Sequence, residues 1–111
     1  GHHNGDQFLI LVAQTLLISL KQEDRACRMG GDEFAAILFF DEHTEDAKMI
    51  ERAQQIFDKV NMTVKATEGG TGISMGVVIA QKETTFTQLY ERSDKALYRA
   101  KQQGRSRMIL F

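Results

Sequence analysis

The residues Gly30-Gly31-Asp32-Glu33-Phe34 place two glycines and two carboxylates between two strand-like segments, residues 25–29 and 33–40. Two strands joined by so short a connection predict a hairpin. The second segment is a continuous apolar run, which predicts a central strand covered on both faces, whereas the first alternates. Asp32 and Glu33 are hard oxygen ligands of the kind that Mg²⁺ shares with substrate phosphates, and glycine lets the backbone lie close to a ligand. The local sequence by itself favours an ordinary type I′ turn with solvated acids, so the rest of the chain has to decide.

The composition indicates one compact domain. The chain has 111 residues, of which 42% are hydrophobic, enough for one core but not for a second domain. A formal net charge of -1 argues against a long nucleic acid as a partner, because there is no bulk positive field. The single Cys27 excludes an internal disulfide, and nothing resembles a secretory leader, so a reducing, cytoplasmic setting is expected.

A first helix is expected over residues 7–20, where no charged residue occurs. Residues 1–6 are predicted to be a polar lead-in, in which Asn4 or Asp6 caps the helix. The helix is apolar nearly all round, yet it is too short and too rich in Gln, Thr and Ser to span a bilayer. It is therefore expected to be buried on more than one side.

Hydrophobic periodicity predicts a second helix over residues 44–61, whose polar face, including Arg52, is solvated. Two β-strand patterns follow, at residues 62–66 and 72–80, with Glu68-Gly69-Gly70 between them. That glycine cluster has neither a following Lys nor a helix start, so it predicts a hairpin turn and not a nucleotide loop.

The third helix is expected over residues 86–103, capped by Thr84 or Thr85 and stopped by Gly104. Residues 107–111 are predicted to form a closing strand. Helix, hairpin, helix, strands, helix and strand in this order predict an α+β sandwich, with helices packed on an antiparallel-rich sheet.

Two basic residues stand at the end of the third helix. Lys101 and Arg105 lie four apart, so they point towards one anionic group if the helical twist runs on beyond Gly104. Favourable pairing of cations with the helix C-terminal dipole explains them equally well.

Four separate motifs, in order along the chain, resemble the GGDEF family of bacterial diguanylate cyclases. They are Gly1-His2-His3-Asn4-Gly5-Asp6, Arg28 with Gly30–Phe34, Ser74-Met75-Gly76-Val77, and the segment of residues 93–107. The resemblance implies a palm-like nucleotide-cyclase sandwich whose central sheet is flanked by helices. It also implies condensation of two GTP molecules into cyclic di-GMP, with release of two pyrophosphates, by a homodimer that uses Mg²⁺ or Mn²⁺.

The resemblance assigns roles to the residues of the first hairpin. Asp32 and Glu33 are implied to share metal coordination and general-base work, as in other two-metal phosphoryl transfers. Gly30 and Gly31 are implied to let the backbone approach the nucleotide.

Three further residues match the family's nucleotide contacts. Asp6 matches the aspartate that recognises guanine. Its carboxylate can accept hydrogen bonds from N1–H and N2–H of guanine, but it would repel the N1 lone pair of adenine. Lys101 and Arg105 match the residues that hold the terminal phosphate.

The chain departs from the family pattern at two places. The family has a strand before the first motif, with a metal-binding Asp, a Phe-Lys pair and an Asn, so residues 1–111 are expected to be an N-terminally truncated domain that lacks this strand. Where many members have Arg-x-x-Asp for product inhibition, this chain has Lys21-Gln22-Glu23-Asp24. Lys21 cannot make the planar bidentate contact of Arg, so Lys21 and Asp24 are expected to be a degenerate inhibitory site.

Three functions stay open at this point. The first is an active cyclase domain, expected downstream of a sensory or regulatory domain and near a membrane only through other domains. The second is an inactive module that binds GTP or cyclic di-GMP for regulation. The third is a dimerisation or docking domain with a vestigial site.

Overall fold

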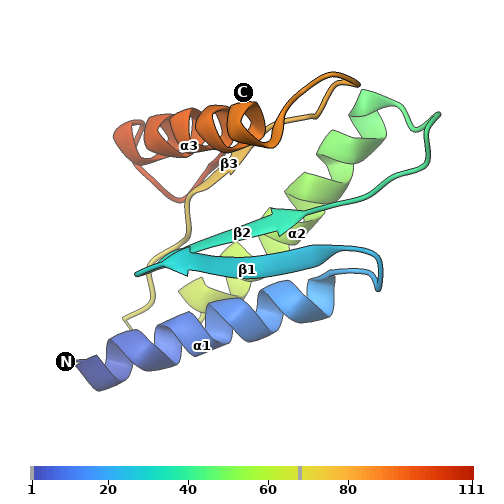
Figure 1. Cartoon of the computed structure of the whole chain (residues 1–111). Coiled ribbons are helices and arrows are strands. Elements are labelled where there is room, and N and C mark those ends of the chain that lie inside the picture. Colours follow the sequence, from blue (N-terminus) through green and yellow to red (C-terminus); the bar gives the residue numbers. More distant parts are fainter. Residues whose placement is uncertain (1, 68) are drawn as a thin grey trace.

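The computed structural model describes residues 2–67 and 69–111 and has an α+β fold (Figure 1). The elements, in order, are α1 (His2–Ser19), β1 (Arg25–Gly30), β2 (Glu33–Ile37), α2 (Asp46–Lys65), β3 (Met75–Val77), α3 (Phe86–Gln102) and β4 (Met108–Leu110). The predicted fold class is therefore confirmed, and so are the first hairpin, the third helix and the closing strand.

The strands form two separate pairs in the described part of the chain. β1 and β2 are antiparallel, while β3 and β4 are parallel, with Gly76 opposite Ile109. The prediction that β2 is a central strand covered on both faces is wrong, since β1 is its one strand partner among residues 2–67 and 69–111. β2 ends at Ile37, and the apolar run beyond it is a loop in which Phe39 is 53% exposed.

α2 is longer than its sequence pattern predicts, and the prediction of a strand at residues 62–66 is wrong. The apolar positions of α2 continue at helical spacing as far as Val64, which is fully buried, so tertiary packing outweighs the preference of β-branched residues for strands. The prediction of a second hairpin is therefore also wrong, because β3 pairs with β4 and not with a strand at residues 62–66. Part of its expected turn, Glu68, lies outside the described residues.

α1 also differs from its prediction. It begins at His2, so Asn4 and Asp6 lie inside the helix and cannot cap it. One face packs on α2 through Val12, but Ile10, Leu17 and Ile18 on other faces are 55%, 60% and 71% exposed. Burial on more than one side is therefore not observed in the described residues. None of the described helices is long and apolar enough to cross a membrane.

The ends of α3 follow the predicted signals. Thr85 is the N-cap, and its side chain and that of Gln88 form a reciprocal capping box. At the other end Gly104 has φ +110, and the Arg105 N–H donates to the Ala100 carbonyl over 2.9 Å, as in a Schellman motif.

The core lies along α2, where Ile56, Val60 and Val64 meet Val12 of α1. Asn61 connects this core to the β3, α3 and β4 unit. Its Oδ1 accepts from the Ile73 N–H at 2.8 Å and from the Ser106 hydroxyl at 3.4 Å. Phe34 of β2 also packs against this core, so the first hairpin and the unit of β3, α3 and β4 are both attached to α2.

Candidate functional site

The tip of the first hairpin is a two-residue turn, Gly31 and Asp32, between the paired residues Gly30 and Glu33. A type I′ turn needs positive φ at both central residues, and only Gly31 has it, at +50°. The type I′ alternative is therefore wrong. The register shifts between Arg28 and Gly30, so the β1 strand is irregular where it enters the turn.

The two acids of the turn differ in their surroundings. Asp32 is exposed, and within the described residues its carboxylate has no hydrogen bond and no ion pair. Glu33 is half-buried, and its Oε1 lies 4.0 Å from Nζ of Lys101 on α3. Both side chains of this pair are substantially exposed, so it adds little stability. Its importance is positional, because it brings a cation from the end of α3 to the carboxylates of the turn.

Arg105 is not aligned with Lys101 in the way that the sequence spacing suggested. α3 ends at Gln102, and the backbone then takes left-handed φ values of +110° at Gly104 and +62° at Arg105. The helical twist therefore does not run on, and the expectation that the two cations share a helix face is wrong. The Arg105 side chain is exposed, and in the described part of the chain it forms no hydrogen bond or ion pair.

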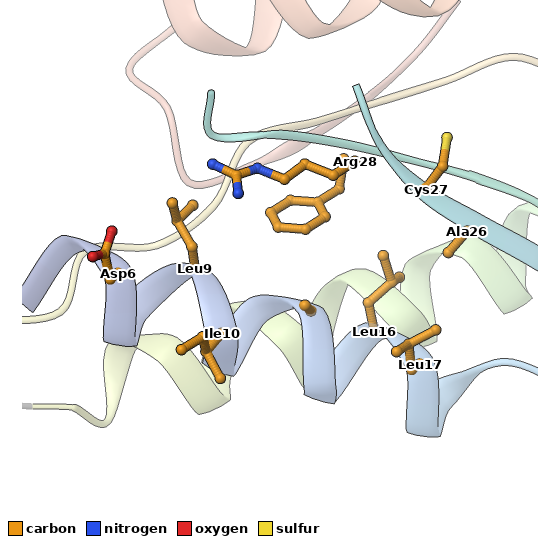
Figure 2. A pocket seen from close by; sticks show the side chains of 10 residues that line it. Asp6, Leu9, Ile10, Leu16, Leu17, Ala26, Cys27 and Arg28 are labelled. Carbon is orange, nitrogen blue, oxygen red and sulfur yellow. The ribbon is translucent and has the colours of Figure 1, made fainter. Parts of the chain in front are cut away.

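A cavity of about 540 Å³ lies between α1 and the first hairpin (Figure 2). Its charged lining groups are Asp6 and Arg28, and its remaining walls are mainly aliphatic, including Leu9 and Leu16. In Figure 2 the guanidinium of Arg28 extends over the end of the cavity where Leu9 and Asp6 lie. The structure thus brings Asp6 and the strand that leads into the turn to one cavity, although they are far apart in sequence.

The described residues contain no group of three or more His, Cys, Asp or Glu side chains that could hold a metal ion. Asp32 and Glu33 provide two carboxylates at one turn. Mg²⁺ is commonly bound through one or two carboxylates together with substrate phosphates, so this pair fits a metal that arrives with a nucleotide. The other coordination positions of a metal held by this pair are left to water or to phosphate oxygens, so the site is open and not enclosed by protein ligands.

Asp24 has a structural environment that the sequence did not reveal. It is 5% exposed, and its carboxylate accepts from the backbone N–H groups of Lys21 at 2.9 Å and Phe39 at 3.0 Å and from Nη2 of Arg52 at 3.0 Å. Arg52 is therefore not on a solvated face, and this expectation is wrong. The sequence around Arg52 gave no signal of this contact, because its partner belongs to another part of the chain. Lys21, by contrast, is exposed.

The hydrogen bonds of Asp24 make its contribution to stability depend on pH. Burial raises the pKa of this carboxyl, but the N–H groups of Phe39 and Lys21 and the Arg52 guanidinium outweigh it and hold the pKa below the ordinary value of 3.8. Since the folded pKa is lowered, the stabilisation is complete above the ordinary pKa and is lost as pH falls through the folded pKa. We expect the free energy of unfolding, measured by urea titration, to fall below about pH 4 less steeply in Asp24→Asn than in the wild type. Equal slopes would contradict this assignment.

Comparison with known proteins agrees with these features. Residues 1–107 match the family model described as "Diguanylate cyclase, GGDEF domain". Diguanylate cyclase DosC of Escherichia coli (strain K12) is 31% identical over 114 residues, covering 100% of this chain and 24% of DosC. The chain thus spans about a quarter of the length of this relative.

Solved structures show the same fold. The coiled coil and GGDEF domain of DgcB from Caulobacter crescentus, in complex with c-di-GMP, has a TM-score of 0.82 at 26% identity, covering 100% of this chain and 60% of that one. Diguanylate cyclase SiaD from Pseudomonas aeruginosa, in complex with its activator SiaC, has a TM-score of 0.79 at 28% identity, covering 100% and 43%. With its hairpin of two glycines and two acids, and a family match over nearly its whole length, the chain belongs to the GGDEF domain family of diguanylate cyclases.

Proposed function

We propose that this chain is the catalytic domain of a diguanylate cyclase, which condenses two GTP molecules into cyclic di-GMP and two pyrophosphates. The observation that supports this most directly is the distance of 4.0 Å between Nζ of Lys101 and Oε1 of Glu33, next to the carboxylate of Asp32, which has no partner in the described part of the chain. Paired carboxylates next to a cation are the groups that a metal-bound triphosphate requires. The aliphatic cavity with Asp6 at its end lies on the same side of the hairpin as α1.

In this proposal the two acids act on the metal and on the nucleophile. Asp32 and Glu33, together with the triphosphate, would hold Mg²⁺ or Mn²⁺, which would neutralise part of the triphosphate charge when bound. Glu33 accepts the proton of the attacking 3′-hydroxyl, whose oxygen forms a bond to the α-phosphorus of the other GTP. The bond from that phosphorus to the bridging oxygen breaks, and pyrophosphate leaves. A second, identical step closes the ring, so a homodimer with one GTP in each subunit is proposed.

The remaining residues bind and orient the nucleotide. Asp6 accepts from N1–H and N2–H of guanine, which selects guanine over adenine. When the nucleotide binds, Lys101 leaves its ion pair with Glu33 and binds the terminal phosphate. The exposed side chain of Arg105 supplies a second cation to the same phosphate. Gly30 and Gly31 leave space for the phosphates, since a Cβ built on either meets no atom within 4 Å.

An upstream regulatory domain and a cytoplasmic location are also proposed. The relatives support the first point, because the DgcB structure includes a coiled coil and SiaD is bound to its activator SiaC. Feedback inhibition through Lys21 and Asp24 is not proposed, since three hydrogen-bond donors already occupy the buried Asp24 carboxylate.

The alternative is a module that binds GTP or cyclic di-GMP without turnover. It is favoured by one observation, namely that the described residues hold no cluster of three potential metal ligands. Catalysis by this family is implied to need a further carboxylate, and a binding role does not.

The deciding experiment is conversion of GTP by the natural full-length protein in the presence of Mg²⁺ or Mn²⁺. We expect cyclic di-GMP as the product, and a fall in kcat of about 100-fold in Glu33→Gln, because the amide cannot accept the proton. Glu51→Gln is the matched control, since Glu51 is an exposed acid on α2 and its loss leaves turnover unchanged.

Other outcomes select the other functions. If the wild type makes no product while GTP still raises its melting temperature, the protein is a binding module. If GTP has neither effect, a dimerisation or docking role remains.

A further inference from the structure

Arg28 is the side chain that holds the turn of the first hairpin. It projects from β1, and its Nε donates to the Gly31 carbonyl over 2.8 Å, while its Nη2 donates to the same oxygen. Within residues 2–67 and 69–111, no other side chain hydrogen-bonds to Gly30, Gly31 or Asp32. Among the side chains of those residues, the Arg28 guanidinium is therefore the one that restrains the orientation of the turn.

The backbone at the turn is well able to change its orientation. Gly30 has φ +149 and Gly31 has φ +50, and neither position has a neighbouring atom within 4 Å of a built Cβ. Glycine populates both signs of φ readily, so the peptide between Gly31 and Asp32 can rotate at little cost unless something holds it. The register shift between Arg28 and Gly30 further weakens the restraint from strand pairing.

Holding the Gly31 carbonyl also fixes the residue that follows it. The peptide is planar and trans, so when its C=O points to Arg28 the N–H of Asp32 points in the opposite direction. The position of Cα of Asp32 is set by the same plane, and with it the direction in which the carboxylate leaves the backbone. Asp32 has no side-chain partner of its own among the described residues that would do this instead.

From these contacts we infer that Arg28 is a positioning residue, which fixes the Gly31–Asp32 peptide so that the carboxylates of Asp32 and Glu33 meet one cation. The inference rests on the proposed metal-binding role of these two acids. It adds a function for Arg28 that is separate from its charge, because the bonds to Gly31 need the fixed fork of a guanidinium. Loss of such a supporting hydrogen bond commonly weakens metal binding 10- to 100-fold.

The test uses Mn²⁺ alone as the probe, added to the chain without nucleotide. Free Mn²⁺ is measured by electron paramagnetic resonance, and the backbone amides of residues 30–33 are followed by ¹⁵N NMR. In Arg28→Lys, which keeps the charge, we expect Mn²⁺ binding to weaken about tenfold and the amide signals of Asp32 and Glu33 to broaden or double. Arg28 is exposed, so the melting temperature should barely change, which thermal melting checks.

Arg25→Lys is the matched control. Arg25 is also an exposed arginine of β1, but its Nη1 donates to the carbonyls of Gln22 and Asp24, away from the turn. We expect wild-type Mn²⁺ binding and unchanged turn amides in this variant.

Three results would overturn the inference. They are wild-type behaviour of Arg28→Lys, an equal loss in Arg25→Lys, and no Mn²⁺ binding by the wild type. Failure of the proposed function is a different result, namely absence of product from GTP, and it leaves a measured effect of Arg28→Lys on Mn²⁺ binding intact.

Discussion

The Gly76→Ala variant is expected to lose about 3 kcal/mol or more of its free energy of unfolding, because overpacking against backbone cannot be relieved by a change of rotamer. A Cβ built on Gly76 lies 2.3 Å from the Ser93 carbonyl oxygen and 2.4 Å from the Leu97 nitrogen. Both atoms belong to the backbone of α3, so the helix itself has to move away from β3. Urea unfolding followed by circular dichroism measures the loss.

The displacement should also reach the candidate site. Ala96 and Ala100 of α3 are fully buried, and Lys101 follows directly after them. A shift of α3 therefore moves Lys101 away from Glu33, and we expect weaker nucleotide binding in any Gly76→Ala protein that still folds.

Gly5→Ala is the control for this variant. Gly5 lies inside α1, and a Cβ built on it meets no atom within 4 Å. Alanine is favoured over glycine inside a helix, so this variant should gain about 0.5–1 kcal/mol. An unchanged urea midpoint for Gly76→Ala would show that α3 does not lie as close to β3 as the structure has it.

Local signals in the sequence were sufficient wherever an element is defined by its own residues. The capping box of Thr85 and Gln88 and the stop at Gly104 are examples, because each consists of a few neighbouring residues that satisfy one another. The turn of the first hairpin was located in the same way. The need for glycine at position 76 has no local cause, since the atoms that exclude a Cβ come from another element.

The predictions failed where tertiary packing decides which secondary structure a segment adopts. The last turn of α2 contains Thr63 and Val64, which suit a strand, yet Val64 completes the apolar face of the helix and is fully buried. The same limit applies to charges. A sequence pattern places Arg52 on a polar helix face, but it cannot show that Asp24 lies opposite, which turns a solvated cation into one that is 15% exposed.

The site combines both kinds of information. Its acids and glycines are adjacent in sequence, so the motif reveals them. The approach of Lys101 to Glu33 and the clamp of Arg28 on Gly31 are properties of the folded chain. The site therefore depends on how the elements that carry these residues are placed. The buried Asp24 contributes to this placement, because it lies directly before β1, from which Arg28 projects.

Asp24→Ala is expected to cost about 3–5 kcal/mol, because it leaves the Arg52 guanidinium as an unpaired, largely buried charge. The N–H groups of Lys21 and Phe39 lose their acceptor as well, and Nη1 of Arg52 is already a buried atom without a partner among the described residues. Urea unfolding at pH 7 gives the loss. Asp41→Ala, at an exposed acid in the loop after β2, should stay within about 0.5 kcal/mol of the wild type.

The double variant Asp24→Ala with Arg52→Met separates charge from packing. Removing the orphaned cation should restore part of the stability lost in Asp24→Ala, since an apolar side chain of similar length does not need a counter-charge. The two substitutions should therefore be strongly non-additive in a double-mutant cycle. Two results would contradict this: a cost of Asp24→Ala no larger than that of Asp41→Ala, or simple additivity of the two effects in the double variant. Either would mean that the ion pair of Asp24 and Arg52 does not hold the start of β1 in place, and that the hydrophobic core alone does so.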